Sequence, residues 1–315
     1  MLRWNWERSR QSLAPTPPRG SFPTAQPVIA SPRAAEDVFT ATWIGHATVL
    51  LQVGGLNILT DPFFSERASP VPWAGPRRIM SPGVRLEALP PIDAVLLSHN
   101  HYDHFDAPAV KLLARLHRDA TWIVPLELGA SVRRHGATRV VELDWWQQVE
   151  VNGLRVTATP ARHFAARSPR DRNRTLWCGF ALEVRGQRAY FAGDTAYHPD
   201  FGHVGAQGGP FDLVMIPIGA YEPRWFMRVV HVNPEEAVRV YQDITSPHGN
   251  APLMLALHWG TIRLTDEPMD EPPRRAREQW RALGLPDERL WIARFGETRV
   301  VQPAASARGR RAGSR

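Results

Sequence analysis

One seven-residue stretch decides how this sequence is interpreted: Ser98-His99-Asn100-His101-Tyr102-Asp103-His104. It begins at the end of the apolar run Ile92 to Ser98, which predicts a strand buried on both faces. It ends just before Asp106, which can cap a helix that runs through Leu116. The stretch therefore lies between a buried strand and a capped helix.

Four ligand-type side chains occur within six residues of this loop. Positions two apart project to one side of an extended turn, so His99 and His101 can chelate one metal ion through neutral imidazole nitrogens. Asp103 and His104 are offset from that pair and can reach a second ion beside the first. The alternative is a polar loop with chance histidines, which this density of ligands at a strand end disfavours.

A dinuclear site needs more ligands than one loop can supply, and other strand ends offer them. His163, Asp194 and His258 each come just after an apolar run that predicts a strand. A shared sheet edge would gather them around one cleft. Each residue alone is more often structural, but together with the histidine-rich loop they favour a metal site.

The composition is that of a globular protein, with 315 residues of which 43% are hydrophobic and 22% are charged. It excludes a disordered, collagen-like or disulfide-scaffold chain, and its apolar runs fall far short of the roughly 20 residues that span a bilayer. The first ten residues mix Trp4 and Trp6 with charged residues and lack the apolar core of a secretory signal. We therefore expect a cytoplasmic protein. The lone Cys178 is expected to be a buried, inert thiol, with metal binding or nucleophilic chemistry as the alternative.

The formal net charge is +7, and almost all the basic residues are arginine, with Lys111 the single lysine. Four arginines lie in the C-terminal tail, and removing their charges lowers the balance from +7 to +3. General basicity is therefore weak evidence for a nucleic-acid partner, and we expect none. It is compatible with a phosphate-bearing substrate or with transient peripheral contact with an anionic membrane.

Turn residues and charge divide the chain into three parts. Residues 1–37 repeat Pro, Ser and Arg without an apolar period and predict an extended N-terminal arm. Residues 38–303 mix strand and helix signals without a linker and predict one domain, in which two packed sheets are covered by helices. Residues 304–315 predict a disordered basic tail.

Individual elements of the domain can also be predicted. Strands are expected near residues 42–44, 49–53, 56–60, 92–98, 121–124, 154–159, 176–184, 189–192, 213–216, 253–257 and 290–293. Helices are expected near residues 106–116, 125–134 and 274–283. A further helix is expected to start at Asn233, which is followed by a proline and two acidic residues.

The ligand pattern resembles that of the metallo-beta-lactamase-fold hydrolases, whose His-x-His-x-Asp-His signature is unbroken at residues 99–104. The resemblance implies an α/β fold, a four-layer αββα sandwich with two mixed sheets between helical layers. It places the active site at one edge of the sheets. The implied metal ligands are His99, His101, Asp103, His104, His163, Asp194 and His258.

By the same resemblance, the first two histidines of the motif and His163 hold one ion. Asp103, His104 and His258 hold the other ion, and Asp194 bridges the two. The set contains five histidines and two aspartates without a thiolate, so zinc is the first choice, while iron or manganese also suits such a site. The expected cofactor is therefore two divalent metal ions.

Within this superfamily, the sequence more closely resembles the N-acyl-phosphatidylethanolamine-hydrolysing phospholipases D. The similar stretches span most of the chain from about Thr40 to Pro273 and include residues 43–48, 59–63, 90–95, 98–104, 142–146, 191–195, 209–213, 218–227, 231–238 and 258–261. One position departs from the family, which carries Gln directly before the histidine that matches His231, whereas this chain has Val230. Replacing a polar residue beside His231 bears on which substrate is bound more than on which reaction is catalysed.

Further residues are expected around the metals. The catalytic residues are expected to be Asp103, Asp194 and His231, and the resemblance implies that His231 contacts the substrate or assists the leaving group. Asp61 and His46 are expected to hold ligand imidazoles by hydrogen bonds, with fold-stabilising turn residues as the alternative. An apolar wall for acyl chains is expected from Tyr221, Trp225 and Phe226, with Trp145 and Trp146 as further candidates.

Together these expectations describe a zinc-dependent phosphoric diester hydrolase. It would hydrolyse N-acyl-phosphatidylethanolamine or a related phospholipid, as phospholipase D does, through a metal-bridging hydroxide. The first alternative is a lactonase or nuclease on the same fold. The second is a metal-stabilised binding protein without catalysis. The sequence leaves the oligomeric state open, a homodimer included.

Overall fold

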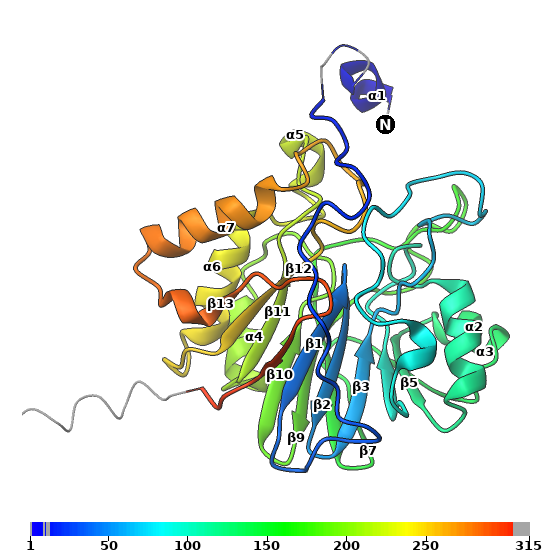
Figure 1. The fold of residues 1–315 in the computed structure, drawn as a ribbon, viewed down its shortest axis with the longest axis vertical. Coiled ribbons are helices and arrows are strands. Elements are labelled where there is room, and N and C mark those ends of the chain that lie inside the picture. The colour runs from blue at the N-terminus through cyan, green and yellow to red at the C-terminus, as the bar shows by residue number, and fades with distance from the viewer. Residues whose placement is uncertain (1, 9, 11–12, 305–315) are drawn as a thin grey trace, which may run out of the picture.

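The computed structural model describes residues 2–8, 10 and 13–304, which form two facing sheets between helical layers (Figure 1). In spatial order the first sheet contains β14 (Thr298–Val300), β1 (Thr40–Gly45), β2 (Thr48–Val53), β3 (Leu56–Thr60), β4 (Ala94–Leu96), β5 (Thr121–Pro125) and β6 (Arg139–Leu143). The second contains β13 (Leu290–Trp291), β12 (Leu253–Leu257), β11 (Leu213–Pro217), β10 (Gln187–Phe191), β9 (Gly179–Val184), β8 (Leu154–Thr159) and β7 (Gln148–Val151). Both sheets combine parallel and antiparallel pairs.

Helices cover the outer face of each sheet. On one side lie α2 (Ala107–Leu116) and α3 (Gly129–Arg134), and on the other lie α4 (Phe201–Gly208), α6 (Pro234–Thr245) and α7 (Glu271–Ala282) (Figure 1). Short elements are α1 (Leu2–Arg8), α5 (Arg224–Met227), and the 3-10 turns η1 (Leu86–Ala88) and η2 (Asp287–Arg289). The predicted αββα sandwich is therefore confirmed.

The hydrophobic core forms two clusters that follow these layers. The larger one includes Trp43, Phe180 and Met215 of the two sheets and extends to α4, α6 and α7, while the smaller one joins the first sheet to α2 and α3. Every residue of β11 and of β12 is buried, because helices cover one face of these parallel strands and the other sheet covers the second. This explains why both strands are continuous apolar runs in the sequence.

Two helix starts were predicted from capping residues and are confirmed. Asp106 caps α2 and accepts a hydrogen bond from the backbone nitrogen of Ala109. Asn233 and Glu236 form a reciprocal capping box at the start of α6, with Pro234 in the first turn. Side-chain capping therefore sets where both helices begin. Helix α2 starts just after the loop at residues 99–104, and α6 starts just after His231.

Other boundaries differ from the prediction. The helix expected from Pro125 begins only at Gly129, because Pro125 still pairs with Leu143 in the first sheet. The helix expected from Arg274 begins earlier, at Glu271. The half-exposed edge strands β6, β7 and β14 were not predicted, since they lack the continuous apolar runs of central strands.

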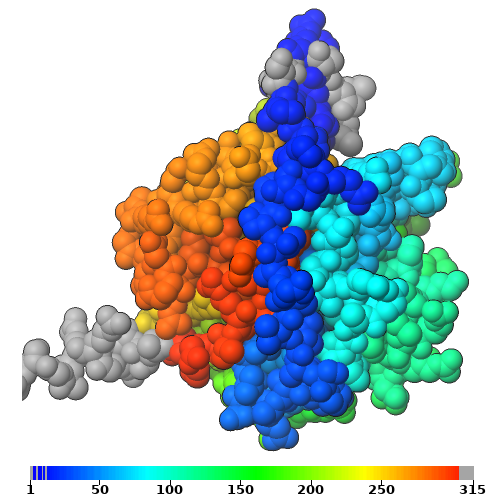
Figure 2. Space-filling view, viewed as in Figure 1, coloured from blue at the N-terminus to red at the C-terminus, as the bar shows by residue number. Residues whose placement is uncertain are grey.

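The N-terminal arm is not extended throughout, since Leu2–Arg8 forms a helix, so the prediction of a wholly extended arm is wrong there. From Leu13 onward the arm runs along the molecule as a blue band over the seam between the orange and cyan segments (Figure 2). Backbone hydrogen bonds join Ala25 to Phe295 and Gly20 to Ile79, which fastens the arm to segments far apart in the chain. The predicted disordered tail falls outside the described residues except for Ala304.

Two further expectations concern single features. Cys178 directly precedes β9 and is buried, and burial raises the pKa of its thiol well above the ordinary value, which keeps the thiol neutral. Within the described ranges, no helix has both the length and the apolar character that crossing a bilayer requires.

Replacing Asn233 by Ala is expected to lower the free energy of unfolding by about 1 kcal/mol, because α6 loses its capping side chain. Urea unfolding should show a lower midpoint with an unchanged slope. Asp119→Ala, at a side chain that is 90% exposed, is the control and should change stability by less than about 0.5 kcal/mol. Equal midpoints for the two variants would contradict a stabilising cap.

Candidate metal centre

The predicted ligands lie together at one end of the two sheets. The loop at residues 99–104 follows β4 of the first sheet, while His163, Asp194 and His258 follow β8, β10 and β12 of the second. These three strands run in the same direction, so their carboxyl ends meet at one edge. The predicted convergence of distant strand ends is therefore present in the structure.

The first cluster consists of three imidazoles. The distance from His101 Nδ1 to His99 Nε2 is 2.8 Å and that to His163 Nε2 is 3.2 Å. His163 Nδ1 lies 2.8 Å from the carbonyl oxygen of Val230, which accepts a hydrogen bond from the protonated Nδ1 and leaves Nε2 free to act as a ligand. This geometry allows the three nitrogens to bind one ion.

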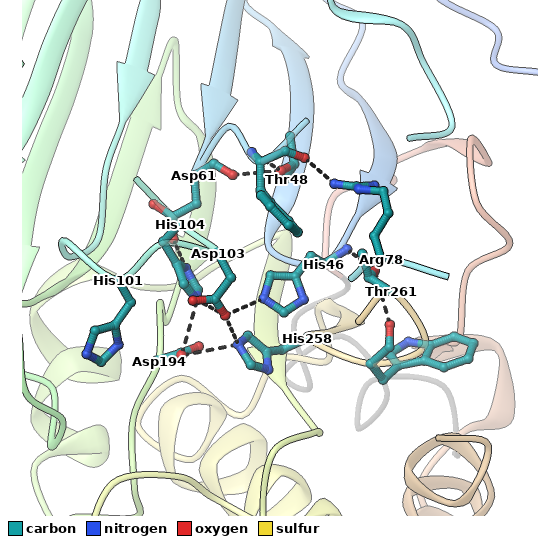
Figure 3. Close-up of polar contacts among 12 residues, drawn as sticks. His46, Thr48, Asp61, Arg78, His101, Asp103, His104, Asp194, His258 and Thr261 are labelled. Atoms are coloured by element: carbon teal, nitrogen blue, oxygen red, sulfur yellow. Dashed lines mark hydrogen bonds and ion pairs between the residues drawn. The ribbon is translucent and has the colours of Figure 1, made fainter. Parts of the chain in front are cut away.

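The second cluster is built around Asp103. Its Oδ2 atom lies 2.8 Å from His46 Nε2 and 3.5 Å from the Nε2 atoms of both His104 and His258. Figure 3 shows these side chains directed toward one another. The ligand atoms of all four residues lie within 4.8 Å of one another, so His46 is itself within reach of an ion, a role that sequence reasoning did not assign.

Asp194 lies between the two clusters. Its Oδ2 atom is 3.2 Å from the Nε2 atoms of His104 and His258, and 3.9 Å from those of His99 and His163. One carboxylate oxygen therefore faces nitrogens from both groups.

Charge differs between the two clusters. Burial opposes ionisation of Asp103 and Asp194, but the neighbouring imidazoles outweigh it and hold the pKa of both carboxyls well below the usual value. Burial and adjacent imidazoles lower the pKa of His101 to about 3, and they also lower that of His99. These two rings are therefore neutral at pH 7 and offer lone pairs to a metal.

The imidazoles next to the carboxylates show the opposite behaviour. Burial disfavours their charged form, but Asp194 and Asp103 raise the pKa of His258 to about 9 and that of His104 well above its usual value. The carboxylates thus require nearby positive charge, which a divalent cation supplies.

Unpaired buried atoms also fit a metal. Within the described part of the chain, His104 Nε2, His258 Nε2 and Asp194 Oδ1 are buried without a hydrogen bond. Burying such atoms is costly unless a partner satisfies them. Nitrogen and oxygen donors without thiolate suit zinc, iron or manganese, so the residues fit a divalent metal.

Asp61 holds two segments of the site together. Its carboxylate accepts hydrogen bonds from the Ser98 nitrogen at 2.7 Å and from His104 Nδ1 at 2.6 Å. The second bond directs His104 Nε2 toward Asp194 and Asp103. The contact agrees with the predicted supporting role, which stays a prediction for function.

A cavity of about 430 Å³ adjoins the metal centre. His231 lines it and places its Nε2 3.9 Å from Asp194 Oδ2. Trp225 and Phe226 line it as expected for an apolar wall. Lining residues that sequence reasoning missed are Trp4, Phe164, Arg172, Met227, Val229 and Leu264. Trp4 comes from α1, and no local motif in the sequence connects it with the site.

Three aromatic candidates lie elsewhere. Trp145 packs against the hydrophobic core and donates a hydrogen bond of 2.7 Å to the carbonyl oxygen of Trp177. Tyr221 is fully buried outside the lining, because its hydroxyl donates a hydrogen bond of 2.7 Å to Glu271 Oε1 beneath α7. Trp146 lines a different cavity, where its ring is 4.7 Å from that of His203. None of these three side chains lines the cavity beside the metal centre.

The fold and this histidine and aspartate cluster define a class of metal-dependent hydrolases, and the chain belongs to the beta-lactamase superfamily. The family description "Beta-lactamase superfamily domain" matches residues 56–259. A Caenorhabditis elegans protein named N-acyl-phosphatidylethanolamine-hydrolyzing phospholipase D 1 is 41% identical over 255 residues, which cover 78% of this chain and 70% of that protein.

Two other proteins are similar to this chain in sequence or in fold. An uncharacterized protein of Mycobacterium tuberculosis is 45% identical over 260 residues, which cover 81% of this chain and 68% of that protein. The solved structure of an isothiocyanate hydrolase from Delia radicum gut bacteria matches with a TM-score of 0.64 at 21% identity, covering 84% of this chain and all of that one. At this identity the structural match supports the fold alone.

Replacing Asp61 by Asn is expected to weaken zinc binding by about 10- to 100-fold, because the amide cannot accept all the hydrogen bonds that orient His104. Competition with a chromogenic chelator measures the change. Asp93→Asn is the matched control, since Asp93 also accepts a backbone hydrogen bond, from Asn57, but lies away from the metal centre. Equal zinc affinities of the two variants would contradict the orienting role of Asp61.

Proposed function

We propose that the protein is a dinuclear metal-dependent phosphodiesterase that hydrolyses N-acyl-phosphatidylethanolamine or a related phospholipid. The main support is the position of Asp194, whose Oδ2 atom faces both ligand clusters at the base of a largely apolar cavity. A carboxylate in such a position can bridge two ions. The C. elegans relative named for this activity supports the same substrate class.

Two divalent ions, with zinc the first choice, supply an activated water and polarise a phosphoryl oxygen when they are bound at such a site. Three imidazoles, those of His99, His101 and His163, would hold one ion. Asp103, His104 and His258 would hold the other. Asp194 would hold the two ions at a fixed spacing and would offset part of their positive charge.

His231 would bind the substrate from the cavity wall. Burial lowers its pKa well below the usual value, so its imidazole is neutral at pH 7. Its Nδ1 atom forms no hydrogen bond among the described residues. A neutral imidazole in the cavity wall, with Nε2 directed toward Asp194, suits a hydrogen bond to the phosphodiester or its leaving group. Val230, the residue before His231, also lines the cavity and adds an apolar contact there.

The expected result of a substrate panel is turnover of lipid phosphodiester, with lactone and nucleic acid left intact. Asp194→Asn should lower that rate by at least about 1,000-fold, because the bridging charge contributes several kcal/mol to the transition state. The measurement is product release by the metal-loaded protein, with circular dichroism to verify folding. Asp119→Asn, an exposed carboxylate, is the control.

Each other outcome of the panel has a definite meaning. Turnover of lactone or nucleic acid alone would replace the proposal by the corresponding hydrolase. Bound metal without turnover of any substrate would indicate a metal-stabilised binding protein. Wild-type rates in the Asp194→Asn variant would refute the bridging assignment.

Transient contact with an anionic membrane is part of this proposal. Beside the cavity, α1 and α5 expose Trp6 and Trp225, and Val229 follows α5 with an exposed fraction of 47%. Exposed arginines accompany them at Arg3 and Arg228. Aromatic and cationic side chains together favour the surface of an anionic bilayer.

Trp225→Ser is expected to lower binding to vesicles that contain phosphatidylglycerol several-fold, because an interfacial aromatic side chain is lost. Cosedimentation measures the bound fraction. Trp73→Ser is the matched control, since Trp73 is 77% exposed but lies outside the cavity lining. Equal losses in the two variants would contradict a docking surface at α5.

A further inference from the structure

Two residues outside the ligand set connect the segments that carry the first cluster. Arg167 Nη1 donates hydrogen bonds to the carbonyl oxygens of Asn100 at 2.7 Å and Phe105 at 2.8 Å, at either end of the metal-binding loop. In return, the Tyr102 hydroxyl donates to the carbonyl oxygen of Arg167 at 2.9 Å. We call this reciprocal contact the Arg167–Tyr102 clasp.

Stacking adds to these hydrogen bonds. The Arg167 guanidinium carbon lies 3.8 Å from the centroid of the Tyr102 ring and 4.8 Å from that of Phe105. Arg167 is half-buried, and the hydrogen bonds of its guanidinium go to the two loop carbonyls. Its charge is therefore directed to the loop carbonyls and the aromatic faces, where a planar group with several donors fits better than an ammonium.

The segment that carries Arg167 is itself closed by hydrogen bonds. Asp171 accepts from the backbone nitrogens of Arg167 at 3.0 Å and Ser168 at 2.7 Å. The backbone nitrogen of Asn173 donates to the carbonyl oxygen of Ala165 at 2.7 Å. The clasp thus joins the metal-binding loop to a second loop of defined shape, which starts just after His163.

This connection matters because the ligands of the first cluster come from both sheets. His99 and His101 belong to the loop after β4, whereas His163 follows β8. Their ligand atoms must stay within a few ångströms of one another to share an ion. We propose that Arg167 and Tyr102 are positioning residues that set the spacing of His99, His101 and His163 and thereby the affinity of this cluster for a divalent ion.

The proposal requires metal binding but no particular substrate. Neither clasp residue is among the residues that line the cavity beside the metal centre. A change in metal affinity on their replacement therefore cannot arise from a lost substrate contact. Supporting residues of this kind typically change metal affinity by about 10- to 100-fold.

The test is zinc affinity, measured without substrate by competition with a chromogenic chelator. Arg167→Met keeps the length of the side chain but removes its donors, and we expect a loss of affinity of about 10- to 100-fold. Arg167→Lys retains a charge and a donor and should restore part of that affinity. Arg170→Met is the matched control on the same loop, with an exposed side chain, and should bind zinc as the wild type does.

Tyr102→Phe tests the other half of the clasp with little risk to folding. It should weaken zinc binding, and combined with Arg167→Met it should cost less than the product of the two separate losses, because both remove one shared contact. Unchanged zinc affinity in both single variants would overturn the proposal. So would a loss of thermal stability in the metal-free protein with no change in zinc affinity. Because no substrate is present, the result is independent of the substrate panel.

Discussion

Two buried carboxylates among imidazoles are the constraint on which the rest of the structure depends. Asp103 and Asp194 are removed from water, and a buried charge is stable only when it is paired. The fold brings histidines that follow β1, β4, β8 and β12 to within 4 Å of these carboxylates. This concentration of ligands is unfavourable by itself, and a bound cation would offset the cost.

The surrounding backbone shows how strongly the site is determined. His46, Asp61 and His258 have positive φ angles of 56°, 28° and 63°, which residues other than glycine seldom adopt. Each such residue costs about 1–3 kcal/mol and persists only where its surroundings hold it. His46 and His258 belong to the second cluster, and Asp61 forms a hydrogen bond with His104 of that cluster. The strained backbone therefore lies where it orients these side chains. The arm adds Trp4 to the cavity from outside the residues that match the superfamily.

Much of the site could be predicted because its chemistry is local in the sequence. The motif at residues 99–104 carries four ligand-type side chains at the close spacing of a metal-binding loop, and the apolar runs before His163, Asp194 and His258 are long enough to identify strands. Capping of α6 by Asn233 depends on a side chain and a backbone group three residues apart. Edge strands such as β7 were not predicted, because half-exposed strands lack a continuous run of apolar residues.

The sequence by itself determined the candidate ligands and most of the strands and helices, since these follow from residue type and short-range spacing, whereas the class of fold and the sharing of ligands between two ions were implied by the family resemblance. Only the tertiary structure decided which side chains face the metal centre. Trp225 lines the cavity, whereas the Tyr221 hydroxyl is hydrogen-bonded to Glu271 of α7. Trp4 lines the cavity and Arg167 binds the metal-binding loop, although no sequence motif near either residue indicates these contacts. Local patterns specify an element and its buried face, but the meeting of two distant surfaces depends on the packing of the whole domain.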